Sequence, residues 1–486
     1  MIQFTPEYLK QRIYACWLGK NIGGTLGTPY EGLQQINDIH GFNSKAGEPL
    51  PNDDLDLQLA WLRAVNDYGP DAITSKLLGE YWISWVTPHW NEYGVCKANM
   101  RDGVLPPMSG EVNNEEWKHS NGAWIRTEVW ACMYPGMPEK AIRMAFEDAS
   151  VDHGFGEGTY AAIFVAAMES AAFVIRDANA LLDIGLSKIP EDCRVARSVN
   201  IVREAHKNGV SWQDCREALV RDSADLGWFQ APANIGFVVL GLLYGAGDFK
   251  QSLIYAINCG DDTDCTGATL GSLMGIMGGM DVIPEDWRAY IGDGIKSICL
   301  TNGHGPFPKD CTELTECIMN LLPVTLRADH QQIFAGQTDR TAHLGDETIL
   351  DARAEDFYGR EFVEKIGRRK PYSYTIEGIY ADALIEFDSV PEIRPNGTLT
   401  GTVTMLAHTL PEQKHYRLSF YTPEGWTVDC QKNLFTPATH SKFVSHATAP
   451  FTITAGERVE GVNRMVLEIV CAGRPTPILV PIQIMG

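Results

Sequence analysis

The most constraining feature of the sequence is an acidic turn that leads directly into an apolar segment of small residues. Asp261, Asp262 and Asp264 place three carboxylates within four residues, and residues 267–279 carry no charge. Residues 253–257, before the turn, are apolar as well. We therefore expect the turn to be buried at the start of a helix, where crowded carboxylates are costly without a counter-charge. A hard cation such as Mg²⁺ or Ca²⁺ would supply that charge, and a solvated helix cap is the alternative.

A second acidic cluster stands at the start of another predicted helix. Asn52, Asp53, Asp54 and Asp56 precede or open a helical pattern that runs through residues 57–65. Carboxylates from two distant helix starts are what a two-metal site with oxygen ligands needs. Two independent helix caps would give the same pattern, so both interpretations stay open at this point.

The charge of the chain excludes several classes of partner. The formal net charge is −22, the isoelectric point is near 4.9, and no basic stripe offsets them. An electrostatic grip on nucleic acid or an anionic membrane is therefore not expected. The first residues lack the basic and apolar regions of a signal peptide, and the twelve cysteines show no zinc spacing. We expect a cytoplasmic protein with reduced thiols, and the sequence leaves its oligomeric state open, a homo-oligomer included.

Helical patterns dominate the first two thirds of the chain. The segment 19–32 is rich in glycine but lacks a phosphate-loop or dinucleotide pattern, so we predict close helix packing followed by a loop. Residues 88–122 are predicted to form a long irregular segment of the kind that carries function. Helices are predicted at residues 7–19, 57–86, 122–133, 138–150, 159–175, 233–245 and 248–257, and a charged amphipathic helix or pair of helices at 195–225.

Strand alternation begins only beyond residue 345. The predicted fold class is therefore multidomain α + β. An all-α domain over residues 1–345 is followed by a charged linker or helix over 346–371 and a small all-β sandwich of unknown role over 372–486. The alternating segments are residues 401–405, 416–420, 451–454, 465–470 and 478–484.

Four segments between about residues 10 and 325 carry a family resemblance when taken in order. They are the glycine-rich segment 19–31 ending in Glu31, Asn52 to Ala60, Ser120 to Arg126 with His153 after it, and Gly260 to Ala268. Together they resemble the motifs of the ADP-ribosylglycohydrolases. The resemblance implies an all-α domain around a binuclear Mg²⁺ or Mn²⁺ centre that hydrolyses the glycosidic bond at C1 of a ribose.

The resemblance also implies a role for particular residues. Glu31 matches the family's acid/base, and Asp53 and Asp262 are further catalytic residues that it implies. Asn121, Gly122 and His153 match substrate-binding positions. The implied metal ligands are Asn52, Asp53, Asp54, Asp262, Asp264 and Cys265.

Two implied ligands depart from the family pattern. Asn52 stands where the family has threonine, and its amide oxygen can still bind a hard cation. Cys265 stands where the family has threonine or serine, and a thiol is a poor Mg²⁺ ligand. Thr266 or a water would then replace it, or the contact would be lost. Asp56 and Asp261 are extra carboxylates, which we expect to hold metal-bound waters.

Three functions remain compatible with these observations. The first is a metal-dependent hydrolase that releases ADP-ribose from a side chain or metabolite. The second keeps the metals but acts on another ribosyl or furanosyl compound, because aromatic side chains can stack on sugars. The third is a non-catalytic protein resembling the lens-crystallin members of the family, which the retained acidic pairs argue against. The tryptophans behind the second function are Trp82, Trp85, Trp90, Trp117 and Trp124.

Overall fold

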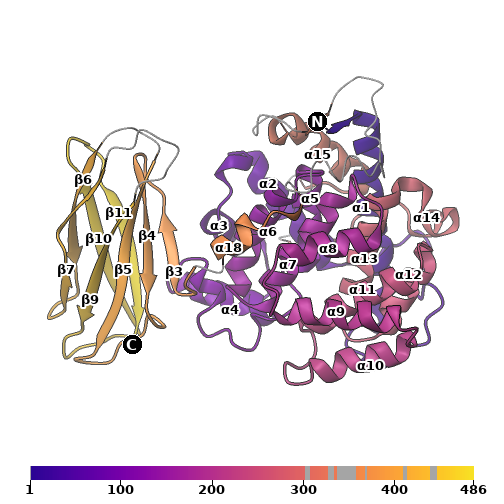
Figure 1. The fold of residues 1–486 in the computed structure, drawn as a ribbon, viewed down its shortest axis with the longest axis horizontal. Helices are drawn as coiled ribbons and strands as arrows, with labels where there is room; N and C mark the ends of the chain where they lie inside the picture. The colour runs from indigo at the N-terminus through magenta and orange to yellow at the C-terminus, as the bar shows by residue number, and fades with distance from the viewer. Residues whose placement is uncertain are drawn as a thin grey trace. The chain divides into compact units, whose positions relative to one another are not determined.

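The chain divides into a helical unit and a strand unit in the computed structural model. The first unit comprises residues 1–97 and 113–367, and the second comprises residues 98–112 and 368–486. Figure 1 shows the helices between residues 6 and 325 in indigo to salmon and the strands beyond residue 372 in orange to yellow. The structure describes residues 2–300, 307–326, 333–335, 357–366, 369–408, 413–437 and 446–486.

Two helices pack against each other through glycine at the centre of the helical unit. Helix α1 (Pro6–Gly27) starts at Thr5, whose side chain accepts a hydrogen bond from the Tyr8 amide, and it runs antiparallel to α13 (Thr263–Gly278). A Cβ atom on Gly23 would lie 2.0 Å from the carbonyl oxygen of Gly267. One on Gly19 would lie 2.2 Å from that of Gly271. Only hydrogen fits between these backbones, so glycine is required along this interface.

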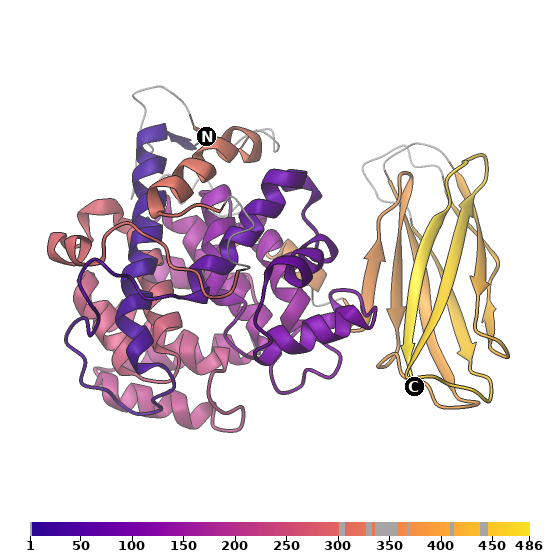
Figure 2. The ribbon, with the colours of Figure 1, turned by 180° about the vertical axis from the view of Figure 1, so that it is seen from behind.

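The remaining helices surround this pair. In the view from behind, in Figure 2, α1 is the long indigo helix beneath the N-terminus. The others are α2 (Asp53–Tyr68), α3 (Ser75–Trp85), α4 (Asn91–Arg101), α5 (Glu128–Met133), α6 (Pro138–His153), α7 (Glu157–Ala172), α8 (Ala178–Ser187), α9 (Arg194–Lys207), α10 (Trp212–Asp222), α11 (Ala231–Tyr244), α12 (Phe249–Asn258), α14 (Glu285–Ile291), α15 (Cys311–Thr325) and α18 (Glu361–Ile366).

The predicted helix positions need three corrections. The first helix does not end at residue 19 but continues to Gly27, because its glycines are packed against α13. The helix predicted over 57–86 is two helices, separated at Gly69, whose φ of 84° ends α2. Residues 88–122 contain α4, which the sequence concealed because Gly94 interrupts a largely polar segment.

Short strands also occur at the edge of the helical unit. Strand β1 (Ile2–Phe4) pairs in parallel with β2 (Ile333–Ala335), so this unit is helical apart from one two-stranded ribbon. Of the predicted linker 346–371, residues 346–356 and 367–368 lie outside the described residues, and Glu361–Ile366 forms α18. No helix of the described chain is long and apolar enough to cross a membrane.

The strand unit is an antiparallel β-sandwich, as predicted. One sheet has the order β11-β10-β6-β8 and the other β3-β4-β5-β9-β7. Inward-facing residues alternate along the strands, as in β4, and both sheets contribute to one apolar core. The strands are β3 (Ser373–Ile376), β4 (Ala381–Phe387), β5 (Thr398–Ala407), β6 (Lys414–Tyr421), β7 (Thr427–Cys430), β8 (Asn433–Thr436), β9 (His446–Thr454), β10 (Val462–Cys471) and β11 (Ile478–Met485).

The core of this second unit includes a segment that is remote in sequence. Val104, Met108 and Val112 are buried in the same apolar cluster as the strands, so residues 98–112 belong to this unit. The sequence gives no sign of this, because the segment carries no strand alternation. The predicted boundaries at residues 345 and 372 stay predictions.

Substitution of a glycine between α1 and α13 should test this interface. Gly23→Ala should lower the free energy of unfolding by about 3 kcal/mol, because the added methyl group overlaps backbone that cannot move aside alone. Gly41→Ala is the matched control, since nothing lies within 4 Å of its Cβ position. It should change stability by less than about 0.5 kcal/mol. Chemical denaturation of both variants measures the difference, and equal stabilities would contradict the packing argument.

Candidate metal centre and active site

An acidic cavity opens where three helices begin. It encloses about 640 Å³ and lies at the starts of α2, α4 and α13, beside the loop that follows α1. Side chains from the motifs around residues 31, 53, 121 and 262 meet there, although they are far apart in sequence. The carboxylates that line the cavity are Glu31, Asp53, Glu92, Asp262 and Asp264.

The packing of α1 on α13 places Glu31 beside the acidic turn. Because the two helices are antiparallel, the end of α1 lies against the start of α13, and a Cβ atom on Gly27 would lie 2.2 Å from the Thr263 carbonyl oxygen. The next loop is then hydrogen bonded to the turn. The Gly32 amide donates to the carbonyl oxygen of Asp261 at 2.8 Å, and the Asp261 amide donates to that of Leu33 at 2.8 Å.

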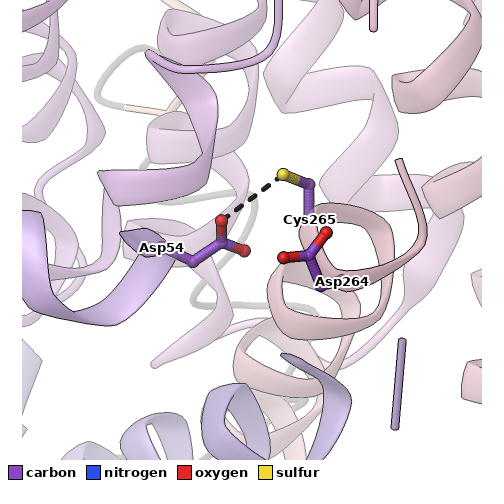
Figure 3. Close-up of side chains that lie close together, drawn as sticks. All are labelled: Asp54, Asp264 and Cys265. Carbon is purple, nitrogen blue, oxygen red and sulfur yellow. Dashed lines mark hydrogen bonds between the residues drawn. The ribbon is translucent and has the colours of Figure 1, made fainter. Parts of the chain in front are cut away.

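Two groups of candidate metal ligands share one carboxylate. Glu31, Asp262 and Asp264 bring oxygen atoms within 4.8 Å of one another, and Asp54, Asp264 and Cys265 do the same with their ligand atoms. Asp264 belongs to both groups. Figure 3 shows its carboxylate directed toward Asp54, across the space between α2 and α13. A carboxylate shared between two adjacent positions is the arrangement that a binuclear centre requires.

The two departures from the family pattern have distinct geometries. The side-chain oxygen of Asn52 accepts a hydrogen bond from the Asp54 amide at 2.8 Å, so this oxygen caps α2. The thiol of Cys265 donates to Asp54 at 3.4 Å (Figure 3). Thr266 donates its hydroxyl to the Thr263 carbonyl oxygen within α13 at 3.2 Å, and its replacement of Cys265 stays a prediction. The oxygen ligands available are therefore mainly carboxylates.

The electrostatics of these carboxylates favour binding of a cation. The charge of Asp264, together with burial and the charge of Asp53, raises the pKa of Glu31 to about 8. Burial and the charge of Asp264 raise the pKa of Asp53 to about 6. Burial also holds the pKa values of Asp54 and Asp262 well above their ordinary range. Each raised pKa indicates a carboxyl group whose ionised form is not fully stabilised by positive charge or solvent.

Unpaired oxygen atoms show that the residues present suit a hard cation. Oδ2 of Asp54, Oδ1 of Asp262 and Oδ1 of Asp264 are buried without a hydrogen-bond partner in the part of the chain that the structure describes. The one cation near them is Lys20, whose Nζ lies 4.0 Å from Asp54 and 2.6 Å from Glu128. Divalent cations with oxygen preference, Mg²⁺, Mn²⁺ or Ca²⁺, match this set of donors.

Comparison with known proteins gives the family. The model of the ADP-ribosylglycohydrolase family matches residues 5–306, which include every residue of this cavity. The chain belongs to the ADP-ribosylglycohydrolase family. Membership supports a glycosyl hydrolase, in a family that is typically metal-dependent.

Solved structures and curated proteins add little to this assignment. A solved chain described as an ADP-ribosylglycohydrolase-related protein complex is similar over 66% of this chain and 99% of its own length. It has 17% sequence identity and a TM-score of 0.44. No curated protein matches the chain.

Two acidic residues of the family motifs serve as structural anchors in this chain. Asp56 accepts hydrogen bonds from the Ser297 hydroxyl and the Cys299 amide, both at 2.7 Å, and so holds the chain around residue 298 against α2. Asp261 accepts from the Phe229 amide at 3.0 Å and from Asn234 at 3.2 Å. Both oxygens of Asp261 accept from protein donors, whereas Oδ1 of Asp56 is buried without a hydrogen-bond partner among the described residues, so the water-holding role stays a prediction.

The predicted substrate-binding residues fall into two sets. Asn121 and Gly122 line the cavity, and the Asn121 amide donates to Asp262 at 2.6 Å. His153 is fully buried and does not line the cavity. Its Nε2 lies 3.0 Å from the Ser120 hydroxyl and its Nδ1 lies 3.0 Å from Asp152. His153 therefore supports the wall at Ser120, and its role in substrate binding stays a prediction.

Sequence reasoning missed the contribution of α4. Glu92 and Tyr93, in the first turn of this helix, both line the cavity. The Tyr93 hydroxyl donates to Asp53 at 2.9 Å, and burial raises the pKa of Glu92. Glu92 lies outside the segments that carry the family resemblance. Its position beside His89, Trp90 and Tyr93 was the one feature of the sequence that could have marked it as a cavity residue.

The raised pKa values predict how pH changes the effect of Mg²⁺ on stability. Without metal, a carboxyl group whose pKa is raised by folding stabilises the fold below its unfolded pKa, and this stabilisation is lost as pH rises through about 6 for Asp53 and about 8 for Glu31. A cation replaces the lost protons. The increase in melting temperature caused by saturating Mg²⁺ should therefore grow between about pH 5 and pH 8.5. Thermal denaturation in chelator and in Mg²⁺ checks this, and a pH-independent increase would contradict it.

Proposed function

We propose that this chain is a divalent-cation-dependent hydrolase that cleaves the bond at C1 of an ADP-ribosyl group or a related ribosyl or furanosyl compound. The observation that carries the proposal is Asp264, which lines the cavity and is shared by two groups of candidate ligand atoms. Family membership supports hydrolysis of a glycosidic bond, and the acidic donors support two Mg²⁺ ions, with Mn²⁺ or Ca²⁺ as substitutes.

The metal centre we propose uses carboxylates from both helix starts. Asp54 and Asp264 would hold one ion, and Asp262 and Asp264 the other, with Asp53 adjacent and Glu31 beside the second ion as the proton-transfer group. When bound, the ions would supply positive charge that orients sugar hydroxyls and makes a water molecule more acidic. Asn121 holds Asp262 in position through its hydrogen bond, and Tyr93 does the same for Asp53.

Glu31 is the group that moves a proton in the proposed reaction. It is exposed at the cavity, and its raised pKa keeps a proton on the carboxyl near neutral pH in the absence of metal. A protonated carboxyl can donate to the leaving atom, and the resulting carboxylate can take a proton from the attacking water. The nearby carboxylates would stabilise the positive charge that develops on the sugar.

A purely structural role is less well supported. Four carboxylates, those of Asp53, Asp54, Asp262 and Asp264, are held close together, and three of them retain buried oxygens without partners among the described residues. Burying like charges in this way destabilises a fold, and a protein without catalytic function gains nothing from it. We place the reaction in the cytoplasm, with a small molecule or a ribosylated protein as substrate and no nucleic-acid or membrane partner.

Removal of the shared carboxylate should test the metal centre. Asp264→Asn should lower Mg²⁺ affinity by at least about 100-fold, because loss of a direct ligand costs more than loss of an outer one. It should also raise the melting temperature of the metal-free protein, because it removes repulsion among the carboxylates. Asp71→Asn, at an exposed turn, is the control. Calorimetric titration with Mg²⁺ measures the affinity of both variants, and thermal denaturation in chelator measures their melting temperatures. Unchanged affinity in Asp264→Asn would remove the binuclear assignment.

Replacement of the proposed acid should separate chemistry from metal binding. Glu31→Gln should lower kcat by roughly 10²- to 10⁴-fold, because the amide cannot transfer the proton, while Mg²⁺ affinity changes much less. Glu48→Gln is the control, since this glutamate is exposed and pairs only with Lys45. Turnover of ribosylated substrates measures the effect, and a wild-type rate in Glu31→Gln would exclude Glu31 as the acid.

A further inference from the structure

Glu92 places a fifth carboxylate in the cavity, outside the two groups of candidate ligands that share Asp264 and in a separate buried group with Asp152 and His153. Its side chain lines the cavity although the residue is only 6% exposed. Oε2 has no hydrogen-bond partner among the described residues, and Oε1 lies 3.9 Å from Nε2 of His153. A Cβ atom at Gly122 would lie 2.2 Å from Oε1, so the absence of a side chain there makes room for this carboxylate. A buried acceptor without a partner is costly unless something else satisfies it.

The position of Glu92 is fixed by the rest of the site. It is the second residue of α4, and the next residue, Tyr93, is hydrogen bonded to Asp53 at the start of α2. The ring of Tyr93 packs 4.9 Å from that of buried Trp82. The backbone of Glu92 is therefore fixed by its neighbour Tyr93, which is bonded to a residue of the proposed metal centre.

The charge of the cavity wall disfavours a phosphorylated substrate. Five carboxylates line the cavity, while no lysine or arginine does so within the described ranges. Helix N-termini can bind phosphate, but each of the three helices that start here already carries its own carboxylate, at Asp53, Glu92 and Asp264. Four of these carboxylates lie in the segments that carry the family resemblance, and Glu92 adds a further carboxylate against which a phosphate would have to bind.

The remaining wall suits an uncharged sugar derivative. Trp90 is 47% exposed and lines the cavity together with Tyr93 and Phe229. Aromatic faces such as these stack on sugar rings or on a planar leaving group. Carboxylates commonly accept hydrogen bonds from hydroxyl groups, and these charge-assisted bonds are stronger than neutral ones.

We propose that the substrate is an uncharged furanoside, a sugar or nucleoside without phosphate, and that Glu92 determines this specificity by binding a sugar hydroxyl and repelling phosphate. This inference rests on the proposed function, because it assumes that the sugar binds at the metal centre. The proposed function allows an ADP-ribosyl group or a related ribosyl or furanosyl compound, and this inference restricts the substrate to the second class.

Binding of three sugars to the Mg²⁺-loaded full-length protein tests the inference. The probes are methyl β-D-ribofuranoside, ribose 5-phosphate and ADP-ribose, titrated by calorimetry. Methyl β-D-ribofuranoside should bind at least tenfold more tightly than either phosphorylated compound. Glu92→Gln should weaken its binding about tenfold and strengthen binding of ribose 5-phosphate, so that the preference narrows or reverses. Glu80→Gln, on the exposed face of α3, should change neither.

The possible results separate the two proposals. Tighter binding of a phosphorylated compound, or an unchanged preference in Glu92→Gln, overturns the inference and leaves the metal-dependent hydrolase intact. Failure of all three sugars to bind also overturns it. In that case a Mg²⁺ titration decides the proposed function separately, since a chain that binds no Mg²⁺ has no metal mechanism. If Glu92 were merely structural, Glu92→Gln would weaken the binding of all three sugars equally and would leave the ratio of their affinities unchanged.

Discussion

The close approach of α1 and α13 is the constraint on which the site depends. Because Gly19 and Gly23 meet Gly271 and Gly267 backbone to backbone, the register between the two helices is fixed to within one turn. This register brings the end of α1, and with it Glu31, to the acidic turn at the start of α13. A larger residue anywhere along the interface would separate the helices and move Glu31 away from Asp264. The glycines thus position catalytic groups without touching them.

The buried lysine near the acidic turn is already paired with another carboxylate. Burial alone lowers the pKa of Lys20, but Glu128 and Asp54 raise it above its ordinary value, so this lysine stays charged. Its short contact is with Glu128, which also accepts hydrogen bonds from Ser272 and Gln58. Lys20 is therefore largely neutralised before it reaches the metal centre.

A second buried cation is committed elsewhere. Arg126 is fully buried and forms ion pairs with Asp148 and Asp152, at 2.9 and 2.8 Å. Asp152 in turn contacts His153, behind the wall at Ser120. The family's arginine and histidine motifs thus form a network that supports the cavity from outside. This leaves Asp53, Asp262 and Asp264 without a protein counter-charge, which is the condition that favours divalent ions over hydrogen-bonded partners.

The sequence predicted what depends on residue type and missed what depends on three-dimensional packing. Crowded carboxylates before an apolar glycine-rich segment could be read directly as a buried acidic helix start, and the glycines of residues 19–32 as close packing. In contrast, nothing in the sequence shows that Asp56 would anchor residues 297–299, or that residues 98–112 would join the sandwich core. Glu92 was missed for the same reason, because α4 reaches the cavity through packing alone.

The substitutions at Asn52 and Cys265 change the donor atoms of the centre and leave its charge and its framework unchanged. Asparagine caps a helix as well as the threonine of the family does, so α2 still starts at the same residue and Asp53 and Asp54 keep their places. Cys265 donates to Asp54 and offers no oxygen. Because the neutral oxygen ligands are lost or already engaged in hydrogen bonds, carboxylates supply nearly all the atoms available to bind a cation.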